Sequence, residues 1–327
     1  MALLEITGLT VDFSTELGAH RALEGFSLAL EPGETMAVVG ESGSGKTVQA
    51  LAVMGLLQSP PAKIVAGTVK YNGTNLLALE PEKLRRLRGD RIAMIFQDPM
   101  TSLNPVFTVG AQIEETLLVH NRARNREEAR RRTIELLADA GIDSPADRAG
   151  QYPHQFSGGM RQRAMIACAL ACNPDLLIAD EPTTALDVTI QAQILKLLAG
   201  LRLKYKAAVL LITHNLGIVA ENADRVTVLY GGRVMERAKT AELLAAPRHP
   251  YTRGLLRSLP SLKGNPDRLS AIAGAPPAPY EKISGCVFSP RCPRAFWPCK
   301  TVQPAETVFE DGSACACHLY SGGKAAP

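Results

Sequence analysis

Eight consecutive residues form the strongest chemical motif of the sequence, and they fit a phosphate-binding loop in full: Gly40-Glu41-Ser42-Gly43-Ser44-Gly45-Lys46-Thr47. The glycines let the backbone approach phosphates closely, so that its N–H groups form a nest for anions. We expect Lys46 to reach the β and γ phosphates and the Thr47 hydroxyl to bind Mg²⁺, which prefers oxygen ligands. The loop follows a short apolar run, Thr35 to Val39, and precedes a helical pattern, as such loops do.

Two adjacent carboxylates, Asp180 and Glu181, end the apolar run Leu176 to Ala179. Asp180 can hold magnesium through water, and Glu181 can orient or deprotonate an attacking water. Together with a phosphate loop, this pair predicts nucleotide hydrolysis.

Gln97 and His214 each follow an apolar run, Arg91 to Phe96 and Ala208 to Thr213. Ligands of an open parallel sheet gather at the carboxyl ends of its strands. Both side chains are therefore candidates to approach the γ phosphate, although each alone is more often a capping or packing residue.

A second phosphate-binding segment is predicted at Phe156-Ser157-Gly158-Gly159, just before a polar helix start. It offers a hydroxyl and free backbone N–H groups at a helix N-terminus, which favours an anion. Two such devices in one chain suggest two nucleotides shared between two chains.

The elements that must position these residues alternate between strands and helices. Apolar runs of strand length, including Asp175 to Ala179 and Ala208 to Thr213, are typical of parallel strands buried on both faces. A helix over Val188 to Tyr205 supplies the crossover between them, and helices are predicted over 45–57, 109–151 and 158–172. Alternating patterns over 3–13, 22–30 and 65–71 predict half-buried strands, and Gly231-Gly232 predicts a hairpin. The fold class is therefore α/β.

Length, charge and hydropathy exclude several classes of protein. The chain has 327 residues and a net charge of +4, too mild to indicate nucleic acid. Six arginines in residues 122–132 have no interleaved aromatic residues, so they indicate a solvated helix face. No apolar run reaches the ~18 residues of a membrane helix, and no secretory signal is visible, so we expect a soluble, cytosolic chain. If it acts at a membrane, other subunits must hold it there.

Five of the seven cysteines lie in the last 42 residues: Cys286, Cys292, Cys299, Cys315 and Cys317. In a reducing cytosol, clustered cysteines favour a metal over disulfides. Four thiolates can complete an iron–sulfur cluster or a tetrahedral zinc site. Packing of structural thiols in a small proline-rich lobe is the alternative. Cys168 and Cys172 lie on an apolar helical stretch and are predicted as core residues.

In order and spacing, the motifs together resemble the ATPase subunit of an ATP-binding cassette (ABC) transporter: Gly40–Thr47, Gln97, Ser157-Gly158-Gly159, Asp180-Glu181, Ala185-Leu186-Asp187 and His214. The resemblance implies a P-loop cassette with a mixed-sheet core, an N-terminal antiparallel β subdomain and a helical subdomain over about 101–172. It implies catalytic roles for Glu181, His214, Gln97 and Lys46. It further implies Mg²⁺ ligation by Thr47, Gln97 and Asp180, and stacking of adenine on Phe13, for which a core position is the alternative.

The family also implies that two ATPases sandwich two ATP molecules head to tail. The segment that contacts the partner's ATP would then include Ser157, Gly158, Gly159, Gln162 and Asp187. Phe156, where leucine is commoner, and Asn215, where aspartate is commoner, depart from the usual pattern but remove no group that touches phosphate.

Three further segments resemble the dipeptide/oligopeptide (and nickel) permease group of that family: residues 96–105, Arg248-His249-Pro250-Tyr251-Thr252, and residues 285–293. This narrower resemblance implies a cassette over 1–247 and a loop-rich extension over 248–327. It implies a [4Fe–4S] cluster on Cys286, Cys292, Cys299 and Cys317, with Zn²⁺ and Cys315 as alternatives. It also implies a paralogous second ATPase, two transmembrane permease subunits and an extracytoplasmic solute-binding protein.

The expected function is ATP hydrolysis that powers peptide import at the cytoplasmic face of the inner membrane. Nickel or glutathione are alternative cargoes. A non-transport ATPase acting on DNA or ribosomes is disfavoured, because the chain has neither a coiled-coil insertion nor a second cassette. A metal-sensing regulator is disfavoured by the intact Glu181 and His214.

Overall fold

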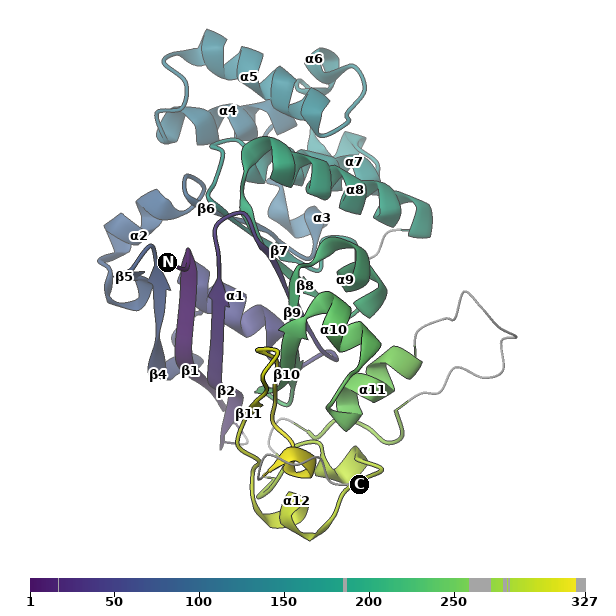
Figure 1. Cartoon of the computed structure of the whole chain (residues 1–327). Coiled ribbons are helices and arrows are strands. Elements are labelled where there is room, and N and C mark those ends of the chain that lie inside the picture. Colours follow the sequence, from purple (N-terminus) through teal and green to yellow (C-terminus); the bar gives the residue numbers. More distant parts are fainter. Residues whose placement is uncertain (17, 185–186, 259–271, 279–280, 282, 322–327) are drawn as a thin grey trace. The chain divides into compact units, whose positions relative to one another are not determined.

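A computed structural model describes the chain except residues 17, 185–186, 259–271, 279–280, 282 and 322–327, which are grey in Figure 1. The chain divides into two compact units. The first comprises Met1–Leu3, Leu30–Glu34 and Ala78–Ile212, and the second comprises Leu4–Ala29, Thr35–Leu77 and Thr213–Pro327. The phosphate loop and the residues after Pro247 therefore belong to the same unit.

Parallel strands form the centre of the first unit: β6 (Ile92–Ile95), β7 (Leu176–Asp180) and β8 (Ala208–Thr213). Ile95 pairs with Ala179 and Ala179 pairs with Leu211, so the carboxyl ends of β6 and β7 lie at one edge. Every residue of these strands is buried, which explains their continuous apolar sequence.

The helices of the first unit are α2 (Pro81–Leu87), α3 (Pro99–Ser102), α4 (Val109–Val119), α5 (Arg126–Asp139), α6 (Pro145–Arg148), α7 (Gly158–Ala169) and α8 (Val188–Tyr205). Helices α4, α5 and α7 pack around a common apolar core that includes Ile113, Leu117, Leu137 and Phe156. The arginine-rich segment forms ion pairs at the surface, such as Arg131 with Glu135 at 2.8 Å. The predicted solvated face is therefore present.

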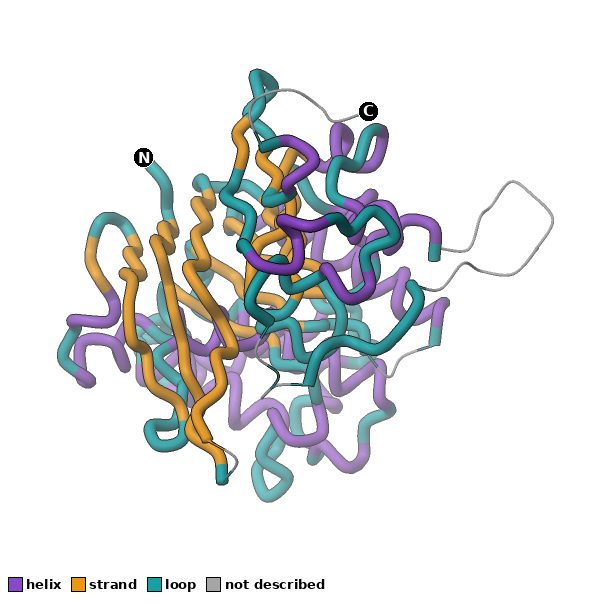
Figure 2. The backbone as a smooth tube through the Cα atoms, turned by 90° about the horizontal axis from the view of Figure 1, so that it is seen from below, coloured by secondary structure: helices purple, strands orange, loops and turns teal. Residues whose placement is uncertain are grey.

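An antiparallel sheet in the second unit has the order β2-β1-β4-β5. Its strands are β1 (Leu4–Thr15), β2 (Gly18–Leu30), β4 (Ala62–Tyr71) and β5 (Thr74–Asn75). The long strands lie side by side in Figure 2. Buried and exposed residues alternate along much of β1 and β2, which explains the polar–apolar sequence of these segments.

A mixed sheet carries the phosphate loop of the second unit. Strand β3 (Thr35–Val39) pairs in parallel with β9 (Arg225–Tyr230), which pairs antiparallel with β10 (Arg233–Lys239). The sheet continues through β12 (Ala314–Cys315) to β11 (Thr307–Val308). The helices of this unit are α1 (Lys46–Met54), α9 (Leu216–Asn222), α10 (Thr240–Ala245), α11 (Pro250–Arg257) and α12 (Trp297–Thr301).

The predicted elements are present, but several of their bounds differ from the structure: β2 begins at Gly18 and not at residue 22, and β4 begins at Ala62 and not at residue 65. The helix predicted over 45–57 ends at Met54, because Gly55 adopts φ 60° and its N–H caps the helix. The predicted hairpin at Gly231-Gly232 joins β9 to β10. No long element appears among the described residues after 257, as predicted, but two-residue strands β11 and β12 extend the mixed sheet there.

Candidate nucleotide-binding and hydrolysis site

The phosphate loop connects β3 to α1, and its glycines are required by its shape. Gly43 and Gly45 have φ of 76° and 99°, in the left-handed region that favours glycine. A Cβ on Gly40 would lie 2.1 Å from the Leu229 carbonyl oxygen. The backbone can therefore curve tightly only because these positions lack side chains.

Lys46 and Ser44 give the loop its polar lining. The Lys46 side chain is buried, and its Nζ donates to the carbonyl oxygens of Gly40 and Glu41, at 2.9 Å each. The Ser44 Oγ is buried without a hydrogen-bond partner among the described residues. An orphaned hydroxyl, an ammonium group and the N-terminus of α1 suit a phosphate group, so the loop fits the predicted nucleotide. Thr47 follows Lys46 in the first turn of α1.

A cavity of about 610 Å³ opens beside the loop within the second unit. Its lining includes Ser42–Ser44 from the loop, His20 from β2, and Pro276–Ala278 from the C-terminal part of the chain. Phe13, the predicted adenine-stacking residue, lies with its ring centroid 5.7 Å from that of His20, at an interplanar angle of 30°. The cavity is large enough for part of a nucleotide, and its wall includes residues far beyond the cassette motifs.

The carboxylate pair lies in the first unit, at the carboxyl end of β7. Asp180 is buried at 2 % exposure. Glu181 has φ 45°, a left-handed conformation that costs about 1–2 kcal/mol outside glycine. Such strain is typical of functional positions. Its Oε2 accepts hydrogen bonds from Gln97 Nε2 at 3.2 Å and from Thr184 Oγ1 at 2.8 Å.

Gln97 and Glu181 are thus brought together by the neighbouring strands β6 and β7, as the sequence predicts for the ends of parallel strands. The contact orients the carboxylate and leaves it able to accept a proton. Thr184 was missed by the sequence reasoning, although it lies only three residues after Glu181.

The signature segment begins α7. Ser157 is exposed and its Oγ accepts a hydrogen bond from the Met160 N–H at 3.3 Å, so it is the N-cap of the helix. Gly158 is exposed as well. Phe156 is buried in the core around α4, α5 and α7, which explains an aromatic residue at that position.

Gln162 and Asp187 are held by local contacts. Gln162 is buried at 1 % exposure and donates to the Pro182 carbonyl oxygen at 2.6 Å, so it connects α7 to the segment after Glu181. Asp187 is the N-cap of α8, accepting from the Ile190 N–H at 2.9 Å. Ala185 and Leu186 lie outside the described residues.

His214 lies in the second unit, exposed and directly after β8. The next residue, Asn215, is the N-cap of α9 and accepts from the Gly217 N–H at 2.8 Å. Asparagine therefore replaces the commoner aspartate without loss of the helix cap.

The C-terminal cysteines lie near one another in the second unit. Burial, with smaller contributions from Cys299, Cys317 and Cys292, raises the pKa of the Cys286 thiol to about 11. A hydrogen bond from the Cys315 thiol lowers the pKa of Cys317 to about 7. Across the described part of the chain, however, no three His, Cys, Asp or Glu side chains are placed as ligands of one metal ion. The arrangement of these thiols therefore does not support the predicted cluster.

Burial raises the pKa of both Cys168 and Cys172 in α7 and the turn after it, with Cys172 at about 11. These two thiols therefore stay protonated, in agreement with their prediction as core residues.

No helix among the described residues combines the length and the apolar character needed to cross a membrane.

Comparison with known proteins identifies the family. Residues 23–184 match the ABC transporter family model, and residues 235–299 match the model of the oligopeptide/dipeptide transporter C-terminal region. The dipeptide transport ATP-binding protein DppD of Escherichia coli (strain K12) is 48% identical over 318 residues, 97% of each chain. The oligopeptide transport ATP-binding protein AppD of Bacillus subtilis (strain 168) shows the same identity over 97% of each chain.

A solved structure agrees with this result. The dimeric post-hydrolysis state of the ATP-binding cassette MJ0796, bound to ADP and Pi, is 30% identical, with a TM-score of 0.65 over 72% of this chain and 98% of that chain. With its phosphate loop, its Glu181–Gln97 pair and its signature helix, the chain belongs to the ATP-binding subunits of the ABC transporter family, in the oligopeptide/dipeptide group.

Proposed function

We propose that this chain is the ATP-hydrolysing subunit that powers import of dipeptides or oligopeptides across the cytoplasmic membrane. The observation that carries the proposal is the 48% identity with DppD and AppD over nearly the whole length of both chains. The phosphate loop and the contact between Gln97 and Glu181 supply the local chemistry that such an activity needs.

Each residue has a proposed part in hydrolysis. Lys46 and the loop N–H groups of residues 40–47 bind the β and γ phosphates and neutralise the charge that develops on them. Mg²⁺ would be held by Thr47, Gln97 and Asp180 and would supply further charge neutralisation. Glu181 accepts a proton from water as the water oxygen bonds to the γ phosphorus. His214 donates a hydrogen bond to the γ phosphate, and the bond from the γ phosphorus to the bridging oxygen breaks to leave ADP.

The exposed N-terminus of α7 supports a head-to-tail pair of ATPases. Ser157, Gly158 and Gly159 would bind the nucleotide held by the phosphate loop of a paralogous second ATPase. Closure of the pair on ATP and reopening after hydrolysis would drive two transmembrane permease subunits, fed by an extracytoplasmic solute-binding protein. This chain would then lie peripherally at the cytoplasmic face of the membrane, with a cassette over 1–247 and an extension over 248–327.

Co-purification tests the partners directly. We expect the chain, isolated from mildly solubilised membranes, to retain two hydrophobic membrane proteins and a second ATPase of related sequence. Isolation of the chain with nucleic acid or ribosomes, and without membrane proteins, would contradict the transport assignment. Nickel and glutathione are the alternative cargoes. Uptake of one of these in place of peptides would contradict the proposed cargo but not the proposed role as a transport ATPase.

We further propose that Cys286, Cys292, Cys299 and Cys317 hold a structural [4Fe–4S] cluster, with Zn²⁺ as the alternative metal. The raised pKa of Cys286, to which the other three thiols contribute, supports their proximity. The hydrogen bond from Cys315 lowers the pKa of Cys317 and favours its thiolate, whereas burial raises the pKa of Cys286 and Cys292. A metal would therefore have to displace the protons of Cys286 and Cys292. A small lobe with only short elements would gain folding stability from the metal.

Metal analysis of anaerobically purified protein tests this site. We expect about four iron atoms per chain, with visible thiolate–iron absorption. Cys317→Ser should lose the iron, and Cys315→Ser, the matched control, should retain it. A chain without iron or visible absorption would contradict the cluster, and about one zinc atom per chain would support the alternative site.

A further inference from the structure

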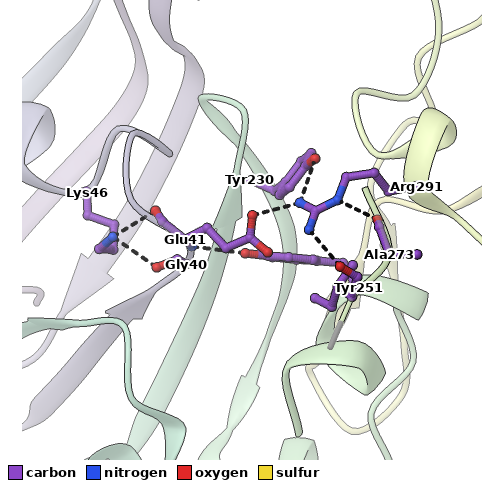
Figure 3. Close-up of polar contacts among 8 residues, drawn as sticks. Gly40, Glu41, Lys46, Tyr230, Tyr251, Ala273 and Arg291 are labelled. Carbon is purple, nitrogen blue, oxygen red and sulfur yellow. Dashed lines mark hydrogen bonds and ion pairs between the residues drawn. The ribbon is translucent and has the colours of Figure 1, made fainter. Parts of the chain in front are cut away.

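A buried arginine of the C-terminal part of the chain is ion-paired with the phosphate loop. The Arg291 side chain is 6% exposed, and its Nη1 donates to Glu41 Oε2 at 2.7 Å. Its Nε donates to the Ala273 carbonyl oxygen at 3.0 Å, and Nη1 also contacts the Tyr230 hydroxyl at 3.2 Å (Figure 3). The guanidinium is therefore fixed from several sides, and its one carboxylate partner among these contacts belongs to the loop.

A second contact reaches the same loop residue. The Glu41 N–H donates to the Tyr251 hydroxyl at 3.0 Å (Figure 3). Tyr251 packs in an aromatic cluster with Tyr230 and Phe288, with centroid distances of 4.6 and 5.2 Å. Both the backbone and the side chain of Glu41 are thus held by residues outside the cassette motifs.

The start of α11, which carries Tyr251, is itself rigidly held. The buried Glu236 carboxylate accepts the N–H groups of Arg248 and His249 at 2.7 and 2.9 Å. His249 Nδ1 accepts the Tyr251 N–H at 3.0 Å, and burial lowers the pKa of His249 to about 3, so the ring stays neutral. These contacts give a structural reason for the segment Arg248-His249-Pro250-Tyr251-Thr252.

Glu41 places a negative charge in a loop built to bind anions. It lines the same cavity as Ser42–Ser44, and Lys46 Nζ is bonded to its carbonyl oxygen. A carboxylate within a few ångströms of phosphate oxygens opposes their binding unless a cation compensates it. Arg291 supplies that cation from a buried position, where its attraction is weakly screened by salt.

We propose that Arg291 is a positioning residue for ATP: by pairing with Glu41 it holds this carboxylate away from the phosphates, so the C-terminal region sets the nucleotide affinity of the loop. The inference rests on the nucleotide-binding role proposed for Gly40–Thr47. The C-terminal extension would then contribute to ATP binding as well as contain the cysteines. Pro276–Ala278 line the same cavity as Glu41 and Ser42–Ser44, so a second segment of the extension lies beside the phosphate loop.

Equilibrium binding of Mg-ATP to the full chain tests the proposal. We expect Arg291→Ala to weaken binding about tenfold, because Glu41 then faces the phosphates uncompensated. The double variant Arg291→Ala/Glu41→Gln should bind within about threefold of the parent, because the opposing charge is gone. Arg257→Ala, which removes the same charge from an exposed site of α11, should bind like the parent.

Restored ATP binding in the double variant would distinguish an effect of Arg291 on the Glu41 carboxylate from a general role of Arg291 in the fold. If Arg291→Ala binds ATP like the parent, or if Glu41→Gln does not restore the double variant, the proposal is wrong. In the assembled transporter, Arg291→Ala should raise KM for ATP and leave kcat within about twofold, since the carboxylate pair is untouched. A parent chain that bound no ATP would overturn the proposed function as well, whereas a parent that binds and an unaffected variant would overturn only this inference.

Discussion

Glu181→Gln is expected to lower ATP hydrolysis about 10³-fold and to leave ATP binding intact. Glutamine keeps the length of the side chain and can still hydrogen-bond to Gln97 and Thr184, which contact the carboxylate at 3.2 and 2.8 Å. It cannot accept the proton of the attacking water. The ATP-bound pair of subunits should therefore stay closed, which gel filtration with Mg-ATP and turnover assays would detect.

Glu127→Gln is the matched control for this variant. It removes the same charge from an exposed position in α5 of the same unit and should hydrolyse ATP like the parent. Parental turnover in Glu181→Gln would refute the assignment of the base. Loss of ATP binding in that variant would instead indicate that Glu181, whose φ is 45°, supports the local fold.

Ser157→Arg should abolish hydrolysis at the nucleotide held by the partner ATPase and leave ATP binding at this chain's own loop largely intact. Ser157 is exposed at the N-terminus of α7, so a long arginine side chain there fills the space for another subunit's phosphates and removes the hydroxyl that would bind them. Measurement of turnover in the assembled transporter, alongside ATP binding by the isolated chain, separates the two sites.

Loss of the helix cap alone is expected to cost about 1 kcal/mol of stability. Asn125→Arg controls for this effect, because Asn125 is the N-cap of α5 and its Oδ1 accepts the Glu128 N–H at 2.9 Å. The control should retain turnover. If Ser157→Arg abolished ATP binding by this chain alone, the head-to-tail arrangement would be contradicted.

Much of this fold is predictable because the motifs lie at element ends with strong local signals. The strand over 35–39, the helix over 188–205 and the strand over 208–213 agree with the structure residue for residue. The contact of Gln97 with Glu181 follows from two apolar strands that pair in parallel. Short apolar and polar patterns in the sequence are enough to predict these strands, this helix and the pairing of the strand ends.

The contacts from the C-terminal region to the phosphate loop could not be predicted in the same way. Arg291 and Glu41 are separated by 250 positions in the chain, and hydropathy periodicity contains no information about such pairs. The segments around Tyr251 and Arg291 resemble those of the peptide permease group, but tyrosine and arginine have no obligatory chemistry at those positions, so the sequence predicts no role for them. Two-residue strands such as β11 and β12 are likewise too short for a periodic signal.

The central claim is that ATP hydrolysis by this chain drives peptide import. The most direct test is uptake of a labelled dipeptide into vesicles that contain the complete transporter, with the solute-binding protein on the side from which peptide is taken up and ATP on the opposite side. We predict uptake that requires Mg-ATP, proceeds with this chain and fails with Glu181→Gln. Uptake at the parental rate with Glu181→Gln, or ATP hydrolysis that never moves peptide with the parent, would contradict the account.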